Sequence, residues 1–584
     1  MIYSDIPTAQ TLVILCKAAG IKDIIISPGS RNAPLTLSFT SDPFFRCFSI
    51  VDERCAAFFA LGIAQHKKEP VAVVCTSGSA LLNYYPAVAE AFYSQIPLVV
   101  ISADRPPYKI DVGDGQTIRQ DHVFDRHIGY SANLEIDVNH AKERLSFYYP
   151  EHLKKDQQTL TKHNQSLVKE ALKVAFKKAL PIHINIPFEE PLYGLQKVDD
   201  QVRNDIILDY KTKSEDRHNF TKFRKIWANS KRKMVLVGVN SPNLVETKYL
   251  EYLAQDPSVI VFTETTSNLH HPNFFPSIDS IIFPIEKSPE RHTRFLQLQP
   301  EVLLTFGGLV VSKKIKAFLR KYKPKHHWHI DPVKAYDTYF ALTNHVKMEI
   351  NGFLTHILSS AKGTLSNYFN EWHQVKLKYE AKRAEYLQMI PFSDFAVFEV
   401  IQKSIPNGYQ VHLANSSTVR YAQLFPMHQS LKVFCNRGTS GIDGSTSTAI
   451  GACIYENNPT VLLSGDLSFF YDSNALWNSY IKNNFRIIVI NNSGGGIFRI
   501  LPGFDDSKRF GTFFETQHTM TAEGLCQQYR LEYSCANDMP SLKKELASFF
   551  QKSQKPRLLE IATPTALNND ILLDYFDFIS SENR

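Results

Sequence analysis

The sequence lacks any long hydrophobic run. None of its apolar stretches approaches the roughly 18 residues that a helix needs to cross a bilayer. The first residues, MIYSDIPTAQTLV, contain no basic region followed by an apolar core, so we expect no signal peptide. These absences favour a cytoplasmic protein without a membrane span.

Concentrated positive charge is also missing. The formal net charge is +7 over 584 residues, and Lys and Arg are scattered, without a basic tail or a stripe interleaved with aromatic residues. Nucleic-acid binding is therefore disfavoured. Anionic small-molecule ligands fit this charge balance better.

The cysteines and glycines lack the spacing of several common sites. No C-x-x-C pair is present, and no G-x-G-x-x-G opens a helix, which argues against a nucleotide-binding dehydrogenase. We interpret His326, His327 and His329 as alternating strand residues, because no second ligand cluster has metal-like spacing. Most cysteines lie in apolar surroundings, as is typical of reduced core residues in a cytoplasmic protein. They are residues 16, 47, 55, 75, 435, 453, 526 and 535.

A chain of 584 residues is too long for one hydrophobic core and should hold about three domains. Apolar runs alternate with helical patterns in residues 1–190, 213–365 and 389–584. We predict an α/β domain in each, with a mainly parallel sheet flanked by helices. The polar segment 191–212 is predicted to be a linker, and the charged segment 366–388 a linker helix.

The predicted strands are short apolar runs that stop in polar or glycine residues, as strands do where their ends carry function. In the first domain these runs are DIIISPGS, FSIVDER, VAVVCTSG, PLVVISADR and PIHINIP. In the second they are KMVLVGVN, SVIVFTET, VLLTFGG and HHWHIDP. In the third they are YQVHLANS, LKVFCNRG, TVLLSGD, FRIIVINN and RLLEIATP.

Residues 461–498 form the most informative stretch. One apolar run ends in Gly465-Asp466, a helix-length segment follows, and a second run ends in Asn492 and three glycines. A βαβ unit with parallel strands would place Asp466 and Asn492 side by side at the carboxyl ends of the strands. Their oxygens suit Mg²⁺, which fills its octahedron with phosphate oxygens and water, and the Gly494 carbonyl can be a third donor. The alternative is an ordinary βαβ tip with a helix-capping Asp.

Glu53 is a second candidate carboxylate. It follows Val51-Asp52 at a predicted strand end and opens the apolar helix AAFFALGIA. An acidic residue in the first turn is favoured by the helix dipole alone. The alternative is a carboxylate that hydrogen-bonds a ring nitrogen of a cofactor.

Several longer segments carry a resemblance to a known family. They are SPGSRNAPL (27–35), DERCAAFFALGIAQ (52–65), TSGSALLNYYPAVAEA (76–91), SADRPP (102–107), GQTIRQ (115–120), NRGTSGIDGS (436–445) and the stretch 461–498. With them the chain resembles, almost end to end, the 2-succinyl-5-enolpyruvyl-6-hydroxy-3-cyclohexene-1-carboxylate synthases, thiamin-diphosphate enzymes of menaquinone biosynthesis. The resemblance is weakest in the central domain and in residues 135–170.

The resemblance implies a transferase that acts as a carboligase. It would decarboxylate 2-oxoglutarate and add the resulting carbanion to isochorismate, using thiamin diphosphate and Mg²⁺, with Mn²⁺ as an alternative cation. Residues 1–190 would bind the pyrimidine of the cofactor, and residues 389–584 its diphosphate and the cation. The active sites would form between subunits of a homodimer or of a dimer of dimers, a homotetramer.

The resemblance also implies roles for cofactor-binding residues. Asp466, Asn492 and the Gly494 carbonyl would hold the cation, and Glu53 would activate the aminopyrimidine. Ile442 would wedge beneath the cofactor, although a buried core residue is the usual role of an isoleucine. Further cofactor contacts would come from Ser416, Gly441, Gly465, Leu467, Ser468, Ile497 and Phe498.

Fixed cations would bind the carboxylates of the substrates. The candidates at strand ends are Arg31, Arg105, Arg420 and Arg437, whose planar guanidinium groups match a carboxylate bidentately, although any one of them could be a solvated surface charge.

The central domain would add Lys313, and its neighbour Lys314 leaves the register open. Ser30, Gln116 and Ser416 would supply neutral hydrogen bonds. Gly115 stands where some relatives carry Asn, so a side-chain contact is absent there.

Two other functions stay open at this point. One is a different thiamin-diphosphate enzyme, either a 2-oxoacid decarboxylase or a carboligase like acetohydroxyacid synthase. The other is a catalytically silent paralogue that binds the cofactor for structural reasons. The joint presence of Glu53, Asp466 and Asn492 argues against the second.

Overall fold

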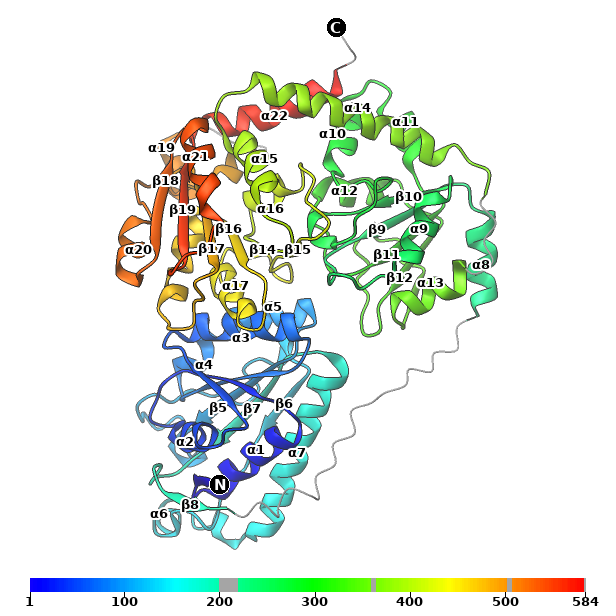
Figure 1. Cartoon of the computed structure of the whole chain (residues 1–584). Coiled ribbons are helices and arrows are strands. Elements are labelled where there is room, and N and C mark those ends of the chain that lie inside the picture. Colours follow the sequence, from blue (N-terminus) through cyan, green and yellow to red (C-terminus); the bar gives the residue numbers. More distant parts are fainter. Residues whose placement is uncertain (199–218, 359–363, 501–506, 582–584) are drawn as a thin grey trace. The chain divides into compact units, whose positions relative to one another are not determined.

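The computed structural model describes residues 1–198, 219–358, 364–500 and 507–581. The chain divides into two compact units, which we describe separately. Unit 1 comprises Met1–Thr212, Gly438–Asn457 and Tyr471–Phe485, and unit 2 comprises Lys213–Arg437, Asn458–Phe470 and Arg486–Arg584. The described residues contain three sheets of five or six strands and one two-stranded sheet (Figure 1).

The first sheet lies in unit 1 and has the order β3-β2-β4-β5-β7-β6, with parallel pairing throughout. Its strands are β2 (Asp23–Ile26), β3 (Arg46–Ser49), β4 (Val71–Cys75), β5 (Leu98–Asp104), β6 (Tyr130–Asn133) and β7 (Ile182–Pro187). The five strands predicted in this region are confirmed. β6 was not predicted, because its sequence YSAN contains no apolar run.

Helices cover this sheet and one of them is almost entirely buried. The helices of unit 1 are α1 (Pro7–Ala18), α2 (Ala33–Ser41), α3 (Glu53–Lys67), α4 (Ser79–Asn83), α5 (Tyr85–Ser94), α6 (Lys142–Tyr148), α7 (Gln157–Lys178) and α17 (Ser445–Cys453). α3 packs closely against α17 (Figure 1). A Cβ on Gly62 would lie 2.1 Å from the Thr448 carbonyl oxygen, so only glycine allows this approach.

The segment predicted to be a linker, 191–212, begins with regular structure. β8 (Leu195–Lys197) pairs antiparallel with β1 (Ile2–Ser4). The part of the predicted linker from residue 199 onward lies outside the described residues.

The central sheet, in unit 2, has the order β10-β9-β11-β12-β13 and is parallel throughout. Its strands are β9 (Lys233–Val237), β10 (Val259–Phe262), β11 (Val302–Phe306), β12 (His326–Ile330) and β13 (Asn344–Val346), and the four predicted strands are confirmed. The histidines of β12 are strand residues: Thr305 Oγ1 lies 2.9 Å from His327 Nε2 and 2.9 Å from His329 Nδ1.

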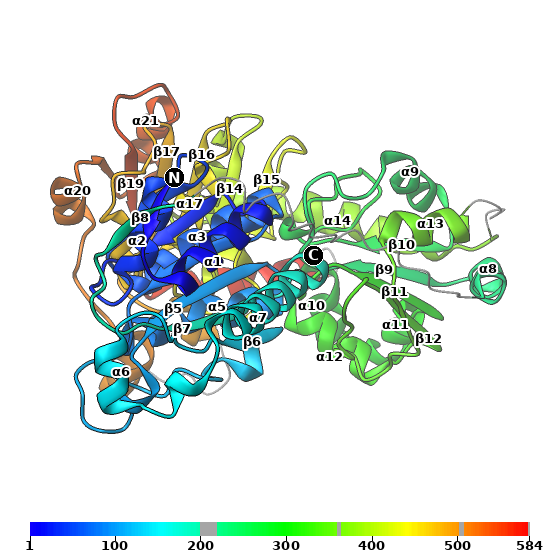
Figure 2. The ribbon, with the colours of Figure 1, turned by 90° about the horizontal axis from the view of Figure 1, so that it is seen from below.

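Alternate residues of the central strands enter two different cores. Val235, Val237 and Trp328 pack with one set of helices, α8 (Phe220–Asn229), α9 (Thr247–Gln255) and α13 (Ile350–Leu358). Met234 and Leu236 pack with the other set, α10 (Asp279–Lys287), α11 (Arg291–Leu298) and α12 (Lys313–Lys321). Figure 2 shows these two helical layers on either side of the sheet. Both faces are thus buried, as is usual for parallel sheets.

The third sheet has the order β15-β14-β16-β17-β19-β18. Its strands are β14 (Gln410–Leu413), β15 (Lys432–Phe434), β16 (Thr460–Gly465), β17 (Phe485–Asn491), β18 (Glu532–Ala536) and β19 (Arg557–Ala562). The five predicted strands are confirmed. The remaining helices are α14 (Tyr368–Met389), which overlaps the predicted linker helix, α15 (Asp394–Ser404), α16 (Ser417–Ala422), α18 (Asp466–Tyr471), α19 (Lys508–Phe510), α20 (Glu523–Tyr529), α21 (Met539–Phe549) and α22 (Leu567–Ser580).

The connection from β16 to β17 differs from the prediction of one helix. α18 ends at Tyr471, and a 3₁₀ turn, η6 (Ser473–Leu476), follows it. Asp472 lies between them with its side chain buried, and Asp472 Oδ2 accepts a hydrogen bond from the Ser447 amide at 2.8 Å. This tertiary contact turns the chain at a point where the sequence alone suggested a longer helix.

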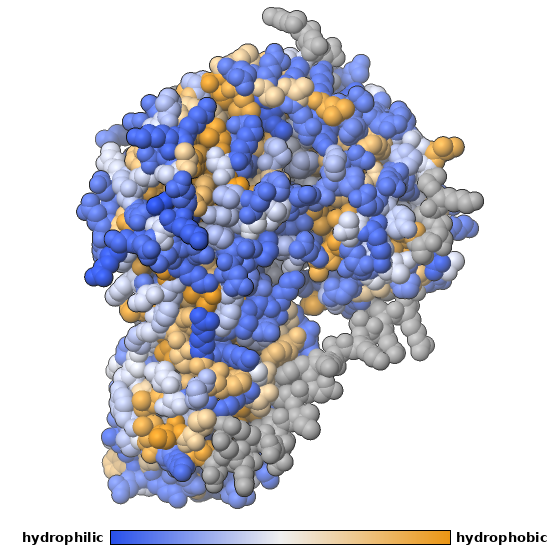
Figure 3. All heavy atoms as spheres, in the orientation of Figure 1, coloured by the Kyte–Doolittle hydropathy of each residue, from blue (hydrophilic) through white to orange (hydrophobic). Residues whose placement is uncertain are grey.

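Three further properties concern the membrane, the surface and the cysteines. Of the helices in the described ranges, none has both the length and the hydropathy that a membrane crossing requires. Polar residues dominate the face seen in Figure 3, with hydrophobic residues in small patches between them. All eight cysteines are free of disulfide bonds.

Candidate active site

The ends of β16 and β17 bring together two predicted cation ligands. The two strands are neighbours in the third sheet. The Gly494 amide donates a hydrogen bond to Asp466 Oδ2 at 2.8 Å, and Asp466 is only 3% exposed. Burial raises the pKa of Asp466, and hydrogen bonds from the Leu467 and Gly494 amides oppose that rise. A bound cation would favour the charged form of this carboxylate.

Asn492 has a fixed orientation beside this carboxylate. Its Nδ2 donates to Asp394 Oδ2 at 3.0 Å. An ionised carboxylate only accepts hydrogen bonds, so the amide nitrogen must face Asp394, and Oδ1 points away from it. Asp394 is buried and also accepts from Thr563 Oγ1 at 2.6 Å. Burial raises the pKa of Asp394 to about 6, and both hydrogen bonds oppose this.

Sequence reasoning missed Asp394. It follows Ser393, the N-cap of α15, and an acidic first-turn residue there has a complete local explanation. Its contact with Asn492 spans 98 residues of sequence, so no local pattern reveals it.

The loop after β17 needs glycine at one position. Gly494 has φ +150°, and a Cβ there would lie 2.7 Å from the Glu515 carbonyl oxygen. The chain can follow this path only without a side chain. The loop brings in a second residue that the sequence did not reveal: His518 Nε2 lies 3.3 Å from Asp466 Oδ2, and the His518 amide donates to the Ser493 carbonyl at 3.2 Å.

These residues fit a hard divalent cation. Asp466 supplies a carboxylate and Asn492 an amide oxygen whose direction is set by Asp394. Mg²⁺ accepts few protein oxygens and keeps positions for phosphate and water. Asn492 lines a small pocket together with Asp394, Ser417, Gly496 and Thr565.

The other predicted cofactor contacts lie on neighbouring segments. Ser416 is the N-cap of α16 with φ +67°. Gly465 ends β16, and Leu467 and Ser468 belong to α18. Ile497 and Phe498 lie in the 3₁₀ turn η7 (Gly496–Ile500), directly after the glycine loop.

Glu53 is the first residue of α3, in unit 1. Asp52 caps the helix by accepting from the Cys55 amide at 3.1 Å, so capping does not depend on Glu53. Burial raises the pKa of Glu53, its own backbone amide opposes the rise, and the charge of Asp52 adds to it. Its half-buried carboxyl group is thus available for a ligand.

Ile442 lies in the loop before α17 and is 37% exposed, so it is not a core residue. Gly441 precedes it in the same loop. An exposed apolar side chain of this kind suits contact with a ligand.

Two predicted arginines lie near the carboxyl ends of strands of the first sheet. Arg31 is 2% exposed and donates from Nη1 to the Phe188 carbonyl at 3.0 Å. Arg105 donates from Nη2 to the Gly115 carbonyl at 3.0 Å, so Gly115 contributes through its backbone. Ser30 and Gln116 are exposed in the loops beside them.

Two further arginines come together in unit 2. Arg420 Nη1 donates to the Ser416 carbonyl at 2.6 Å, and Arg437 Nη1 to Asn415 Oδ1 at 2.8 Å. Burial and then the positive charge of Arg437 lower the pKa of Arg420. Arg437 is buried and Arg420 partly buried, and an anionic ligand would stabilise both of these mutually repelling guanidinium groups.

No functional role was predicted for Glu264, which lies just after the end of β10. It is 3% exposed, and its carboxylate accepts from the amides of Val311 at 2.7 Å and Ser312 at 2.8 Å. Burial raises the pKa of Glu264 to about 7, while these hydrogen bonds and the charge of Arg437 oppose the rise. The Glu264 carboxyl group therefore lies within electrostatic range of Arg437.

The two lysines that begin α12 differ in their surroundings. Lys314 pairs with Glu286, and its ammonium lies 4.2 Å from the centre of the Phe283 ring. Lys313 is exposed. An engaged Lys314 favours Lys313 as the residue available to a ligand.

Two thiamin-related families match this chain. "Thiamine pyrophosphate enzyme, N-terminal TPP binding domain" matches residues 6–126, and "Thiamine pyrophosphate enzyme, C-terminal TPP binding domain" matches residues 415–561. Thiamine pyrophosphate is another name for thiamin diphosphate. The two matches include Glu53 and the ends of β16 and β17.

Three curated relatives are similar over nearly their whole length. The protein from Christiangramia forsetii is 52% identical over 100% of both chains, and that from Flavobacterium johnsoniae is 51% identical over 99% of both. The protein from Porphyromonas gingivalis is 36% identical over 100% of this chain and 98% of its own. All three are named 2-succinyl-5-enolpyruvyl-6-hydroxy-3-cyclohexene-1-carboxylate synthase.

Proposed function

The chain belongs to the 2-succinyl-5-enolpyruvyl-6-hydroxy-3-cyclohexene-1-carboxylate synthase family of thiamin-diphosphate enzymes, and we propose that it catalyses that synthesis from 2-oxoglutarate and isochorismate, with release of CO₂, in menaquinone biosynthesis. The observation that carries the proposal is the grouping of Asp466, Asn492 and Gly494 at two neighbouring strand ends. The full-length similarity to the named synthases supports the choice of substrates.

We propose that Asp466, Asn492 and the Gly494 carbonyl hold Mg²⁺, with Mn²⁺ as an alternative. Bound thiamin diphosphate supplies the chemistry that replaces the carboxyl group of a 2-oxoacid by a new carbon–carbon bond. The protein contributes orientation and charge. Asp394 fixes the Asn492 amide so that its oxygen faces the cation, and the glycine loop allows the backbone to approach the diphosphate.

The residues of unit 1 would act on the organic part of the cofactor. Glu53 would hydrogen-bond a ring nitrogen, and its raised pKa suits a carboxyl group that shares a proton with that nitrogen. Ile442 would support the bent conformation of the cofactor with its exposed apolar side chain. Residues 1–190 would then be the pyrimidine-binding domain, residues 213–365 the central domain and residues 389–584 the diphosphate-binding domain.

The substrates bring several carboxylates, which the arginines would bind. Arg420 and Arg437 already form a positively charged pair, Arg31 is buried, and Arg105 is partly buried. Lys313, Ser30 and Gln116 would complete the substrate contacts. Bidentate pairing orients a carboxylate as well as attracting it, which a reaction of two anionic substrates requires.

One assay tests the proposal directly. Purified protein with thiamin diphosphate and Mg²⁺ should consume isochorismate only when 2-oxoglutarate is present, and the product mass should equal that of both substrates less CO₂. Pyruvate alone serves as the control for a carboligase like acetohydroxyacid synthase. Turnover of pyruvate without turnover of 2-oxoglutarate would replace the proposed reaction by that alternative.

We also propose that the protein acts as a homodimer or a dimer of dimers in the cytoplasm, with residues of two subunits in each active site. Cysteines free of disulfide bonds support the location. Subunits bearing Glu53→Gln, mixed with subunits bearing Asp466→Ala, should regain activity in heterodimers. No recovery in heterodimers verified by mass would place each site within one chain.

A further inference from the structure

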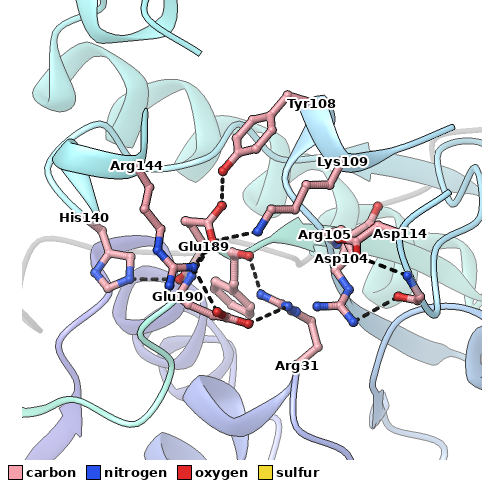
Figure 4. A network of polar contacts seen from close by, with 12 residues as sticks. Arg31, Asp104, Arg105, Tyr108, Lys109, Asp114, His140, Arg144, Glu189 and Glu190 are labelled. Atoms are coloured by element: carbon pink, nitrogen blue, oxygen red, sulfur yellow. Dashed lines mark hydrogen bonds and ion pairs between the residues drawn. The ribbon is translucent and has the colours of Figure 1, made fainter. Parts of the chain in front are cut away.

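A charged network joins the end of β7 to the loop after β5 and to α6. Glu189 lies at its centre (Figure 4). This residue is 1% exposed. The carboxylate of Glu189 accepts from Tyr108, from Lys109 Nζ at 3.0 Å and from Arg144 Nη1 at 3.2 Å. Burial alone would raise the pKa of Glu189, but Tyr108, the Glu190 amide and Lys109 lower it below its ordinary value. These donors therefore hold Glu189 in place as a structural residue in its ionised form.

Glu190, the next residue, is held between two arginines. Its Oε1 accepts from Arg31 Nη2 at 3.3 Å, and its Oε2 accepts from Arg144 Nη1 at 2.9 Å (Figure 4). The two arginines differ sharply in exposure: the side chain of Arg31 is 3% exposed and that of Arg144 is 49% exposed. Glu190 lies closer to the exposed arginine than to the buried one.

Arg31 retains donors for a ligand. Its Nη1 bonds the Phe188 carbonyl, and its Nε is buried without a hydrogen-bond partner among the described residues. A buried N–H left without a partner is costly, and an incoming carboxylate would satisfy it. The Glu190 carboxylate faces the same guanidinium, so it competes with such a ligand for the positive charge.

We infer that Glu190 is an internal competitor for the Arg31 guanidinium, and that Arg144 draws Glu190 away and so sets the affinity for the substrate carboxylate that Arg31 binds. The inference rests on the proposed function, in which Arg31 binds a substrate. Glu190 and Arg144 are then positioning residues that tune specificity for carboxylates. They do so without touching the reacting atoms.

The test uses opposite shifts in KM. Removing the competing charge with Glu190→Gln should lower KM for one substrate about two- to fivefold, the size expected of a partly exposed ion pair. Removing the exposed partner with Arg144→Gln should raise the same KM by a similar factor, because Glu190 then turns fully to Arg31. The double variant should have the same KM as Glu190→Gln, since it lacks the carboxylate that Arg144 attracts. Turnover at saturation and thiamin-diphosphate affinity should stay unchanged throughout.

The matched control is Lys155→Gln. Lys155 is 49% exposed, like Arg144, and pairs with Glu135 in the same unit, so its loss should leave both KM values unchanged. Should Glu190→Gln fail to fold, Glu190→Asp serves instead, because its shorter side chain retreats from Arg31 and should also lower KM.

Arg31→Met tests the substrate role of Arg31 separately from the competition by Glu190. It also shows which of the two substrates Arg31 binds. A raised KM in Arg31→Met, with opposite shifts in Glu190→Gln and Arg144→Gln, supports the inference. A raised KM in Arg31→Met without those opposite shifts overturns the inference and leaves the proposed function intact. An unchanged KM in Arg31→Met for both 2-oxoglutarate and isochorismate overturns the substrate role of Arg31 and the inference together.

Discussion

The first and third sheets have the same strand order and different chemistry at their ends. In both, the second strand of the sheet lies at one edge, the first, third and fourth follow, and the sixth precedes the fifth at the other edge. The counterparts of β16 and β17 are β4 and β5. β16 and β17 lead into Asp466 and Asn492, whereas β4 leads into Thr76 and β5 into Arg105.

In the proposed function, the shared topology supplies the positions and the side chains at them decide what binds there. Parallel sheets of this order place loops at the carboxyl ends of central strands, where ligands bind. Carboxylate and amide oxygens make such a position a cation site, and guanidinium groups make it a carboxylate site. Asp104, the aspartate at the end of β5, forms a hydrogen bond within the sheet: its Oδ2 accepts from Asn185 Nδ2 at 2.8 Å.

The largest effect should come from breaking the cation site of the third sheet. Asp466→Ala removes its one predicted carboxylate ligand, and neutral donors alone cannot offset the dehydration of Mg²⁺. We expect retention of thiamin diphosphate to be lost at ordinary Mg²⁺ concentrations, with the fold intact, as measured by calorimetric titration. The control is Asp104→Asn at the end of β5, the counterpart of β17, which should keep cofactor affinity. Wild-type affinity in Asp466→Ala would refute the assignment.

Glu53→Gln should give the next largest effect. It removes a proton-sharing carboxyl group while keeping size and hydrogen bonding, and such groups contribute ~10²–10⁴-fold to rate. Steady-state turnover should fall by that factor with cofactor affinity unchanged. Asp52→Asn is the control, because asparagine caps a helix as well as aspartate does. A loss of turnover below tenfold would show that Glu53 serves α3 and not the cofactor.

Asp394→Asn tests whether Asp394 orients the Asn492 amide at the end of the third sheet. An asparagine can present either oxygen or nitrogen to Asn492, so the orientation of the Asn492 amide is no longer fixed. Partners of metal ligands typically contribute 10–100-fold to metal affinity, and we expect a loss of about that size for Mg²⁺ in titrations that follow cofactor binding. Thr563→Val leaves the carboxylate facing Asn492 and should cost less. Equal losses in both variants would contradict the orienting role.

The smallest effect in this series should come from Arg420→Lys or Arg437→Lys. Lysine keeps the charge but loses the planar, bidentate group, so KM for one substrate should rise about tenfold, equivalent to ~1.4 kcal/mol. Arg557→Lys is the control: Arg557 begins β19, pairs with Glu532 and should be silent. Unchanged kinetics with both substrates in both variants would make Arg420 and Arg437 structural residues.

The sequence predicted the buried strands well because these strands are continuous apolar runs that end in polar residues. The strands it missed are β1 and β8, which form the two-stranded sheet, and the largely polar β6, β13 and β18, which lie at edges of the larger sheets. β18, for example, has one buried residue, Ala536. Their pairing is set by neighbouring strands and leaves little trace in the local pattern.

Sequence reasoning could single out Asp466 and Asn492 by residue type and position, and the structure places them at neighbouring strand ends, while their role as cation ligands stays a prediction. The site was not predictable where the role depends on a distant partner. Asp394 acts through Asn492, and Glu190 acts between Arg31 and Arg144, which lie 159 and 46 residues away in sequence. A carboxylate at a helix start or strand end has too many local explanations for its distant partner to be inferred.

The central claim is that Glu53 activates the cofactor and Asp466 retains it. The most direct test measures two quantities in Glu53→Gln and Asp466→Ala: cofactor affinity, and exchange of the thiazolium C2 proton into deuterated water. We predict that Glu53→Gln binds thiamin diphosphate like wild type but exchanges the proton ~10²–10⁴-fold more slowly, whereas Asp466→Ala loses binding. Wild-type exchange in Glu53→Gln, or retained affinity in Asp466→Ala, would contradict the account.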